Sequence, residues 1–206
     1  MTEPELIAKL IDQFINDSYA VAEDFLPARL IDRLRTEEKS LFALGQGRQA
    51  AIGRGAVRQV NTTVRGDEIL WLDPNRLSPA QSLYWQALDH LRLQLNRTCF
   101  LSLTDYECHF ARYRRGHTYQ RHRDVFQQNS NRLISCVLYL NAAWEPGQGG
   151  ELRLYLPKNG DEISVDISPA GGTLVILNSR EIAHEVLPAR RCRYSLTGWL
   201  KARGQA

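Results

Sequence analysis

The chain has 206 residues, of which 43% are apolar and 24% charged, the composition of an ordinary globular protein with enough apolar residues for a real core. The formal net charge of +3 is too mild to indicate nucleic acid as the main partner. The sequence lacks both the run of roughly 18 apolar residues that a membrane span needs and the pattern of a signal peptide, so we expect a cytoplasmic protein that does not bind membranes.

Three amphipathic helices are expected in the first half of the chain. Apolar residues recur at helical spacing over residues 4–16 and again over residues 27–44. A third helix should begin after Ser78, a candidate N-cap that is followed by a proline in the first turn, and extend to Leu95. We therefore expect residues 1–98 to form a helical scaffold that packs on the remaining residues as part of the same domain.

A long connection rich in glycine and arginine, residues 45–64, separates the second and third helices. Its arginines are Arg48, Arg54 and Arg58. A connection of this length in a compact domain is usually a lid, a binding loop or a disordered segment. We expect a mobile loop, and spacing alone leaves both a lid and a disordered insertion open. A strand over residues 69–71 should follow.

From about residue 100 the apolar pattern changes from a period of 3.6 to a period of 2, which indicates strands. Turn signals divide this part of the chain into eight short strands, at residues 106–113, 118–123, 133–140, 150–156, 162–165, 172–177, 183–187 and 193–201. Strands at this spacing favour a sandwich or barrel, and a jelly roll is the preferred interpretation. Residues 99–206 would thus form the all-β half of an α+β chain.

The cysteines and three of the histidines are interpreted as structural. Cys99, Cys108, Cys136 and Cys192 form no CxxC pair, and a chain of this size does not need disulfides. We expect buried, reduced thiols. The three remaining histidines outside any motif are expected to be structural or surface residues, namely His90, His109 and His117.

The tripeptide His122-Arg123-Asp124 is the first candidate for metal chemistry. In a strand, residues i and i+2 point to the same side, so His122 and Asp124 would present an imidazole and a carboxylate together. His184 offers a second imidazole later in the chain. Two histidines and one carboxylate can hold one face of a ferrous ion and leave positions open for a co-substrate and oxygen. The tripeptide alone is weak evidence, because it occurs by chance in many proteins.

A cation that could anchor a 2-oxo acid lies on the last predicted strand. An iron enzyme that consumes such a co-substrate must bind its far carboxylate, and a guanidinium does so through two parallel hydrogen bonds. Arg193 follows His184 at a suitable distance in the sequence. Arg190 and Arg191 are nearby competitors, so spacing alone does not choose among the three.

A longer series of motifs, over roughly residues 65–202, resembles the Fe(II)- and 2-oxoglutarate-dependent prolyl 4-hydroxylases, in particular the oxygen-sensing enzymes and their bacterial relatives. In chain order the motifs are Arg65-Gly66-Asp67, Tyr113-Arg-Arg-Gly116, His122-Arg-Asp124, Asn131-Arg132, Val137-Leu-Tyr139-Leu-Asn141, Trp144, Gly149-Gly150-Glu151, His184-Glu-Val-Leu-Pro188, Arg193-Tyr194 and Thr197-Gly-Trp199. Their number and order make this resemblance far more specific than the tripeptide.

The resemblance implies a double-stranded β-helix, a cupin-like jelly roll supported by the N-terminal helices. It also implies that Fe(II) is held by His122, Asp124 and His184, and that O2 and 2-oxoglutarate are consumed, with ascorbate as a candidate reductant. The residues expected around 2-oxoglutarate are Arg193, which would bind the distal carboxylate, Tyr139, which would assist it, and Tyr113, Thr197 and Trp199.

The same resemblance implies hydroxylation of a prolyl residue of a protein at the 4-position, with release of succinate and CO2. Arg132, Arg65 and Asp67 match positions that border the protein substrate, and the connection at 45–64 matches a mobile loop that closes over it. We expect the substrate to be a protein of the translation machinery, such as an elongation factor. Two alternatives stay open: the same chemistry on a free amino acid, another side chain or a nucleic-acid base, and a metal-binding β-helix sensor without turnover.

Overall fold

Helices come first and strands dominate afterwards, in agreement with the expected α+β order. The computed structural model describes residues 2–52, 59–125, 131–158 and 160–203. Its helices are α1 (Glu3–Asp17), α2 (Ala28–Ala43) and α3 (Pro79–Cys99). Its strands are β1 (Tyr19–Ala22), β2 (Arg48–Gln49), β3 (Glu68–Trp71), β4 (Leu103–Tyr113), β5 (Tyr119–His122), β6 (Arg132–Tyr139), β7 (Leu152–Lys158), β8 (Asp161–Ile167), β9 (Leu174–Asn178), β10 (Ala183–Val186) and β11 (Arg193–Ala202).

The three helices begin and end close to the predicted residues, and the sequence supplies capping boxes for α1 and α3. At α3 the Ser78 hydroxyl accepts the Gln81 amide N–H at 3.2 Å, and the Gln81 side chain accepts the Ser78 amide N–H at 3.2 Å. This reciprocal capping box satisfies two backbone donors that a helix start would leave unpaired. The helix ends where Phe100 takes a left-handed conformation, with φ 54°. Among the described residues, none of the helices combines the length and the apolar character needed to cross a bilayer.

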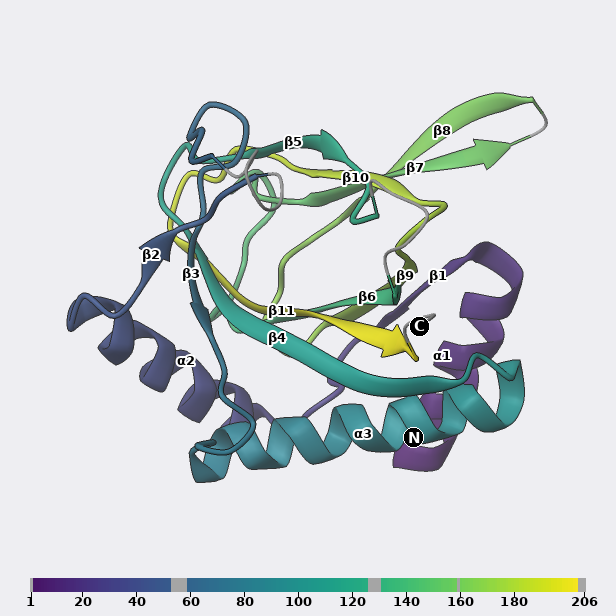
Figure 1. The fold of residues 1–206 in the computed structure, drawn as a ribbon. Coiled ribbons are helices and arrows are strands. Elements are labelled where there is room, and N and C mark those ends of the chain that lie inside the picture. Colours follow the sequence, from purple (N-terminus) through teal and green to yellow (C-terminus); the bar gives the residue numbers. More distant parts are fainter. Residues whose placement is uncertain (1, 53–58, 126–130, 159, 204–206) are drawn as a thin grey trace.

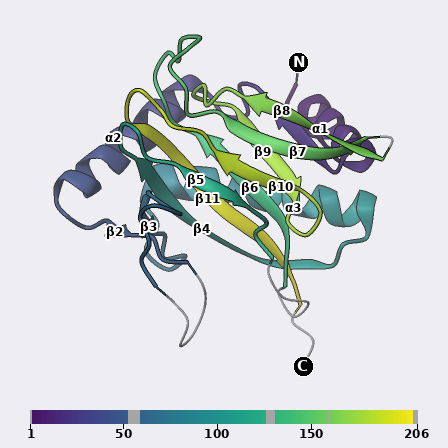
Figure 2. The same ribbon diagram turned by 90° about the horizontal axis from the view of Figure 1, so that it is seen from above.

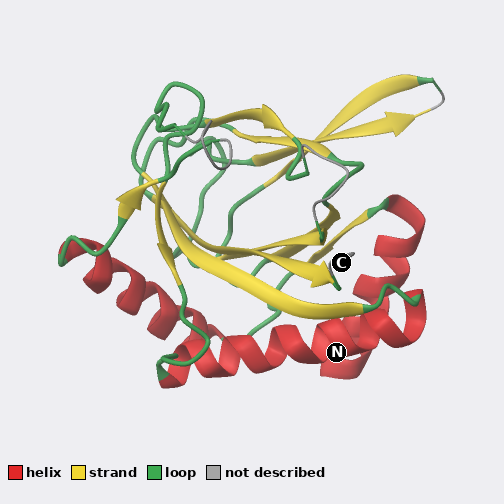
Figure 3. Ribbon diagram, in the orientation of Figure 1, coloured by secondary structure: helices red, strands yellow, loops and turns green. Residues whose placement is uncertain are grey.

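The strands form two antiparallel sheets that face each other, which confirms the predicted double-stranded β-helix. The larger sheet has the order β1-β9-β6-β11-β4-β3-β2, and the smaller one the order β5-β10-β7-β8. In Figure 1 the larger sheet lies between the helices and the smaller sheet, and Figure 2 shows the smaller sheet lying over the larger one when the molecule is seen from above. All three helices cover the outer face of the larger sheet, as Figure 3 shows.

Two separate apolar clusters follow from this layering, because the strands of the larger sheet bury side chains on both faces. On β4, Cys108 and Phe110 point toward the helices, whereas Ala111 and Tyr113 point toward the smaller sheet. The first cluster joins all three helices to the larger sheet. The second fills the space between the two sheets, so the helices anchor one wall of the β-helix from outside. The proposed boundary at residue 98 stays a prediction.

One acidic side chain is buried under the helical layer. Glu38 of α2 is fully buried, and neither carboxylate oxygen has a hydrogen-bond partner in the part of the chain that the structure describes. Burial raises the pKa of Glu38 well above its usual range, although nearby cations, of which Arg112 is the foremost, oppose the shift.

Two short strands were not expected from the sequence. The first, β1, pairs with β9 at one edge of the larger sheet. The second, β2, pairs with β3 at the other edge and lies inside the connection that was expected to be a loop throughout. These strands have only four and two residues, too few to be stable alone, so both depend on the strands beside them.

The four cysteines are free thiols, as expected, although only Cys108 and Cys136 are buried. These two lie on β4 and β6, on either side of Gly198 in β11. A methyl group at Gly198 would come within 2.3 Å of the Glu107 carbonyl oxygen and 2.4 Å of the Cys108 Cβ. Glycine at this position therefore lets three strands of the larger sheet pack closely.

Candidate active site

The two histidines of the candidate metal centre meet because two strands of the smaller sheet pair in antiparallel fashion. His122 ends β5 and lies directly opposite His184 of β10. Asp124 does not share the strand of His122, as the sequence had suggested, but lies in a bend just beyond it. The bend still brings the carboxylate between the imidazoles, with Asp124 Oδ1 3.6 Å from His122 Nε2 and Oδ2 3.7 Å from His184 Nε2.

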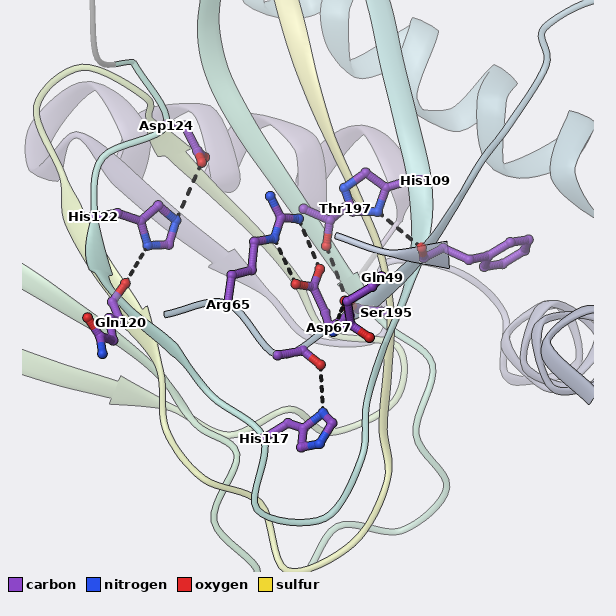
Figure 4. A network of polar contacts seen from close by, with 12 residues as sticks. Gln49, Arg65, Asp67, His109, His117, Gln120, His122, Asp124, Ser195 and Thr197 are labelled. Carbon is purple, nitrogen blue, oxygen red and sulfur yellow. Dashed lines mark hydrogen bonds and ion pairs between the residues drawn. The ribbon is translucent and has the colours of Figure 1, made fainter. Parts of the chain in front are cut away.

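The geometry of these three side chains suits a metal ion. One ligand atom from each residue lies within 4.8 Å of the others. His122 Nδ1 lies 2.7 Å from the Gln120 carbonyl oxygen, and His184 Nδ1 lies 3.2 Å from that of Ile182. A carbonyl oxygen can only accept, so each Nδ1 carries its proton and each Nε2 is left with a lone pair. Backbone contacts of this kind fix the tautomer and orientation of metal-binding histidines. Figure 4 shows the Gln120, His122 and Asp124 part of this arrangement.

Two serines form a hydrogen-bond chain that ends at the Asp124 carboxylate. The Ser135 hydroxyl of β6 donates to Asp124 Oδ2 at 2.5 Å, and the Ser179 hydroxyl lies 2.8 Å from that of Ser135. Burial raises the pKa of Asp124, but the charge of His184, contacts with His122 and the Ser135 hydrogen bond outweigh it and hold that pKa well below its usual range. Burial also lowers the pKa of His184 to about 4, against the opposing charge of Asp124. The site therefore offers an ionised carboxylate at Asp124 and a neutral imidazole at His184, the forms that bind metals.

Arg193 is the buried member of the three candidate arginines. Its exposed fraction is 2%, whereas Arg190 and Arg191 are exposed. It begins β11 opposite Tyr113 of β4, and its Nε donates to the Gly150 carbonyl oxygen at 2.9 Å. The guanidinium carbon lies 5.1 Å from the Tyr113 ring centre and 4.8 Å from that of Tyr139. No carboxylate among the described residues forms an ion pair with it, which leaves a buried cation suited to an anionic ligand.

Most of the residues expected around the co-substrate line a single pocket between the sheets. Tyr139 is the exception, because it is not among the residues that line the pocket. Its ring packs against the Arg193 guanidinium, and its buried hydroxyl makes no well-formed hydrogen bond with the described residues. Burial raises the pKa of Tyr139, and the Arg193 charge partly offsets this. The pocket is lined by Arg65, Asp67, His109, Tyr113, Tyr119, His122, Asp124, Val137, Leu152, His184, Val186, Arg193, Thr197 and Trp199.

The residues expected to border the substrate are engaged with each other or with neighbours. Arg65 donates to both carboxylate oxygens of Asp67, at 2.7 and 2.9 Å, and Asp67 is fully buried (Figure 4). Arg132 pairs with Glu107 at 2.7 Å and stacks over the Trp199 ring at 3.6 Å. The first pair lies in the pocket wall, whereas Arg132 lies outside the pocket lining. A role of these residues in binding a substrate stays a prediction.

The connection at residues 45–64 contributes both described and undescribed residues. Its residues 53–58, which include Arg54 and Arg58, lie outside the described part of the chain. Beyond them, Ile52 pairs with Gln59, and Arg65 forms a bridge with Tyr119 next to the metal centre. The Gly66 amide donates to the Thr118 carbonyl oxygen at 2.9 Å. Val64, the last residue of the connection, accepts the Gln120 N–H at 2.9 Å, so the chain here is tied to β5, the strand that carries His122.

Several residues of the site were not predicted from the sequence. The Tyr119 ring stacks on the His122 imidazole, with ring centres 3.5 Å apart and planes 16° apart, and the Arg65 guanidinium carbon lies 4.7 Å from the centre of the Tyr119 ring. Ser135 supports Asp124, and His109, expected to be structural, lines the pocket. A serine within the apolar run of β6 was a signal that could have been read, because a buried polar residue needs a partner.

Comparison with known proteins places the chain among oxygenases. The 2OG-Fe(II) oxygenase superfamily matches residues 108–201. A human protein named Prolyl hydroxylase EGLN3 is 27% identical over 88% of this chain and 77% of its own length. A mouse protein named Egl nine homolog 1 is 28% identical over 87% of this chain, which spans only 45% of that protein.

Two solved structures share the fold over nearly the whole chain. A Pseudomonas putida prolyl-4-hydroxylase is 40% identical, with 96% of this chain and all of that chain covered and a TM-score of 0.86. A Trichoplax adhaerens prolyl hydroxylase, solved with a peptide of the hypoxia inducible factor oxygen degradation domain, is 25% identical. It covers 97% of this chain and 90% of its own, with a TM-score of 0.85.

Proposed function

The chain belongs to the prolyl 4-hydroxylases of the 2OG-Fe(II) oxygenase superfamily, and from this premise we propose that it hydroxylates a prolyl residue of a protein at the 4-position. The reaction consumes 2-oxoglutarate and O2 and releases succinate and CO2. The observation that carries the proposal is the cluster of His122, Asp124 and His184 in one pocket with the buried, unpaired cation Arg193. A site that only bound a metal would have no use for such a cation beside it.

His122, Asp124 and His184 are the proposed ligands of Fe(II). Their free Nε2 atoms and the carboxylate face one point, and such a triad leaves the far side of the ion open. Bound there together, Fe(II) and 2-oxoglutarate supply the oxidising chemistry that transfers one oxygen atom to the substrate. The protein holds the carboxylate through Ser135 and the imidazoles through backbone carbonyls, so the ligands are oriented before the ion binds.

Arg193 is the proposed anchor for the distal carboxylate of 2-oxoglutarate. Its Nε is occupied by the Gly150 carbonyl, which fixes the direction of the guanidinium and leaves its terminal nitrogens for a carboxylate. The Tyr139 hydroxyl, buried beside it without a well-formed hydrogen bond, is a second donor for the same carboxylate. Tyr113, Thr197 and Trp199 complete the proposed pocket by shaping it and excluding water.

The protein substrate is proposed to contact residues at the edge of the pocket. Arg132, Arg65 and Asp67 are proposed to border the protein substrate, the first through its position over Trp199 and the other two as a rigid ion pair in the wall. The connection at 45–64 is proposed to act as a lid, because it ends at Val64, whose carbonyl oxygen accepts the Gln120 N–H of β5 beside the metal centre. The resemblance to the family further supports a translation-machinery substrate such as an elongation factor, a cytoplasmic location, and ascorbate as a reductant.

Succinate release and proline oxidation test the function together. We expect the purified protein with Fe(II) to convert 2-oxoglutarate to succinate faster when proline-containing proteins of its host are added, and mass spectrometry should find one added oxygen on a proline. Asp124→Ala should abolish both signals and weaken Fe(II) binding, whereas Asp166→Ala, at an exposed ion pair on β8, should retain them. Turnover that survives Asp124→Ala, or oxygen added only to other residues, would refute the proposal.

A further inference from the structure

Two residues that line the pocket each have a buried polar atom without a hydrogen-bond partner among the described residues. The two atoms are Nε2 of His109 and Nε1 of Trp199, whose residues have exposed fractions of 1% and 4%. Both residues line the same pocket as the candidate metal ligands. Their ring centres lie 5.7 Å apart on the neighbouring strands β4 and β11. A buried polar atom without a hydrogen bond is costly, so such an atom in a pocket wall indicates a ligand that completes it.

The two nitrogen atoms have opposite hydrogen-bonding roles. His109 Nδ1 lies 3.1 Å from the Phe110 carbonyl oxygen, to which it can only donate, so its Nε2 bears a lone pair and accepts. Burial, aided by the charge of Arg65, lowers the pKa of His109 to about 4, which keeps the ring neutral in this role near neutral pH. Trp199 Nε1 carries a hydrogen and can only donate. The wall thus offers one acceptor and one donor side by side.

An extended peptide presents the matching pair. The N–H and C=O of one residue in extended conformation point to the same side, as in an antiparallel ladder. Proline itself cannot be the residue that is read, because it has no N–H. The residue before a proline is pushed toward the extended conformation. That residue therefore combines the required geometry with the required donor and acceptor.

The position of the pair relative to the metal centre fits this assignment. His109 lies opposite Thr197 in the β4–β11 ladder, and Thr197 lines the same pocket as His122 and Asp124. Figure 4 shows the His109 ring beside Thr197, with the Arg65–Asp67 pair between it and His122. Trp71, which is 36% exposed, extends the aromatic wall outward from His109, with ring centres 4.8 Å apart. A chain lying along this wall would pass from the exposed rim toward the metal ligands.

We propose that His109 and Trp199 read the backbone of the residue that precedes the target proline, with His109 Nε2 accepting its N–H and Trp199 Nε1 donating to its C=O. This inference rests on the proposed prolyl hydroxylation and adds a determinant of substrate position. His109 is a positioning residue, which recognises main chain and not side chain. It therefore sets the register of the peptide, so that the proline and no neighbouring residue reaches the reactive centre.

The test removes the proposed acceptor, His109 Nε2, from the protein and the proposed donor, the backbone N–H, from the peptide, first separately and then together. An array of synthetic peptides, each with one proline, first identifies the best substrate. This peptide is then prepared in a second form, in which an ester oxygen replaces the backbone N–H of the residue before the proline. In the wild-type enzyme we expect the ester to raise the peptide KM roughly tenfold. In His109→Leu the amide peptide should show the same increase, and the ester should add little to it. His109→Gln, which restores an acceptor, should recover most of the affinity, and the affinity for the co-substrate 2-oxoglutarate should not change in either variant.

Imidazole nitrogen NMR gives a second readout that requires no variant. On addition of the amide peptide to the wild-type holoenzyme, the Nε2 resonance of His109 should shift as that atom accepts a hydrogen bond, and the ester peptide should not produce the shift. An ester penalty that is equally large in wild type and His109→Leu, or an unchanged Nε2 resonance, would overturn the inference while leaving prolyl hydroxylation intact. A wild-type enzyme that hydroxylates no peptide of the array and no host protein would overturn both.

Discussion

The anion-binding end of the pocket depends on one residue of three similar ones. Arg190, Arg191 and Arg193 are close in sequence, but only Arg193 begins β11 with its side chain between the sheets. Arg191 instead lies 5.1 Å from the Trp144 ring and donates to the Ala143 carbonyl at the surface. Arg190 and Arg191 lie in a bend before the strand, so the residue at which β11 starts decides which arginine is buried, and the sequence alone could not fix that start.

Replacement of Arg193 should raise the 2-oxoglutarate requirement steeply. Arg193→Ala removes a charge-assisted anchor from a buried site, at a cost of roughly 2–5 kcal/mol in binding of the co-substrate. Arg190→Ala, at an exposed position, should have little effect. The dependence of succinate release on 2-oxoglutarate concentration measures both. An equal increase in the two variants would mean that the anchor has been assigned to the wrong arginine.

The hydroxyl of Ser135 should tune metal affinity without touching the metal. Ser135→Ala removes the hydrogen bond that orients Asp124 and leaves the Ser179 hydroxyl without this partner. Loss of such support costs about 10- to 100-fold in metal affinity. Titration with Fe(II) under anaerobic conditions measures the change, with Ser164→Ala on the exposed face of β8 as the control. Unaltered affinity in Ser135→Ala would show that the bend around Asp124 holds the carboxylate unaided.

At the scale of secondary structure elements, the periodicity of apolar residues predicted the long helices and strands. It missed the short strands that form only by pairing with a neighbouring strand. All three helices carry apolar faces, and α1 and α3 also carry capping boxes, so local sequence is enough to define them. By contrast, β1 and β2 exist because β9 and β3 offer free edges. The support of Asp124 by Ser135, and the unpaired atom of His109, likewise follow from which strands are neighbours. No local pattern contains that information.

The N-terminal cap of α3 should contribute measurably to the free energy of unfolding. Ser78 caps the helix and also donates to the Glu37 carboxylate of α2 at 2.8 Å, so one hydroxyl serves two helices. Ser78→Ala should lower the free energy of unfolding by about 1 kcal/mol. Chemical denaturation of this variant, compared with Ser82→Ala one turn later in the same helix, provides the measurement. An equal loss in both variants would point to a general effect of serine removal and not to the cap.

At the scale of the whole molecule, the helical layer makes stability depend on pH through Glu38. The pKa of Glu38 in the folded chain lies above its ordinary value of 4.5, because its oxygens are buried without partners. Folding therefore favours the protonated carboxyl. The stability that this provides is fully present below about 4.5 and is lost as the pH rises through the folded-state pKa.

Glu38→Gln should remove this dependence. The variant has no group to titrate at this position, so its free energy of unfolding relative to wild type should improve steadily as the pH is raised above 4.5. Thermal unfolding of both proteins across that interval measures the difference, with Glu37→Gln as a neighbouring control. A constant difference at all pH values would mean that Glu38 is charged in the folded chain and finds compensation from Arg112.

The hairpin of β7 and β8 projects beyond the rest of the molecule, and β8 has no neighbour on its outer side among the described strands (Figure 1). An edge of this kind is a template on which a second chain could add and start an aggregate. The edge strand carries Asp161, Glu162 and Asp166, of which the last two pair with Arg121 and Arg153. Charged side chains on an edge oppose its pairing with another chain, so they should protect the solubility of a jelly roll whose smaller sheet does not close on itself. Neutralising Asp161 and Glu162 should make concentrated solutions scatter light while dilute samples keep their fold.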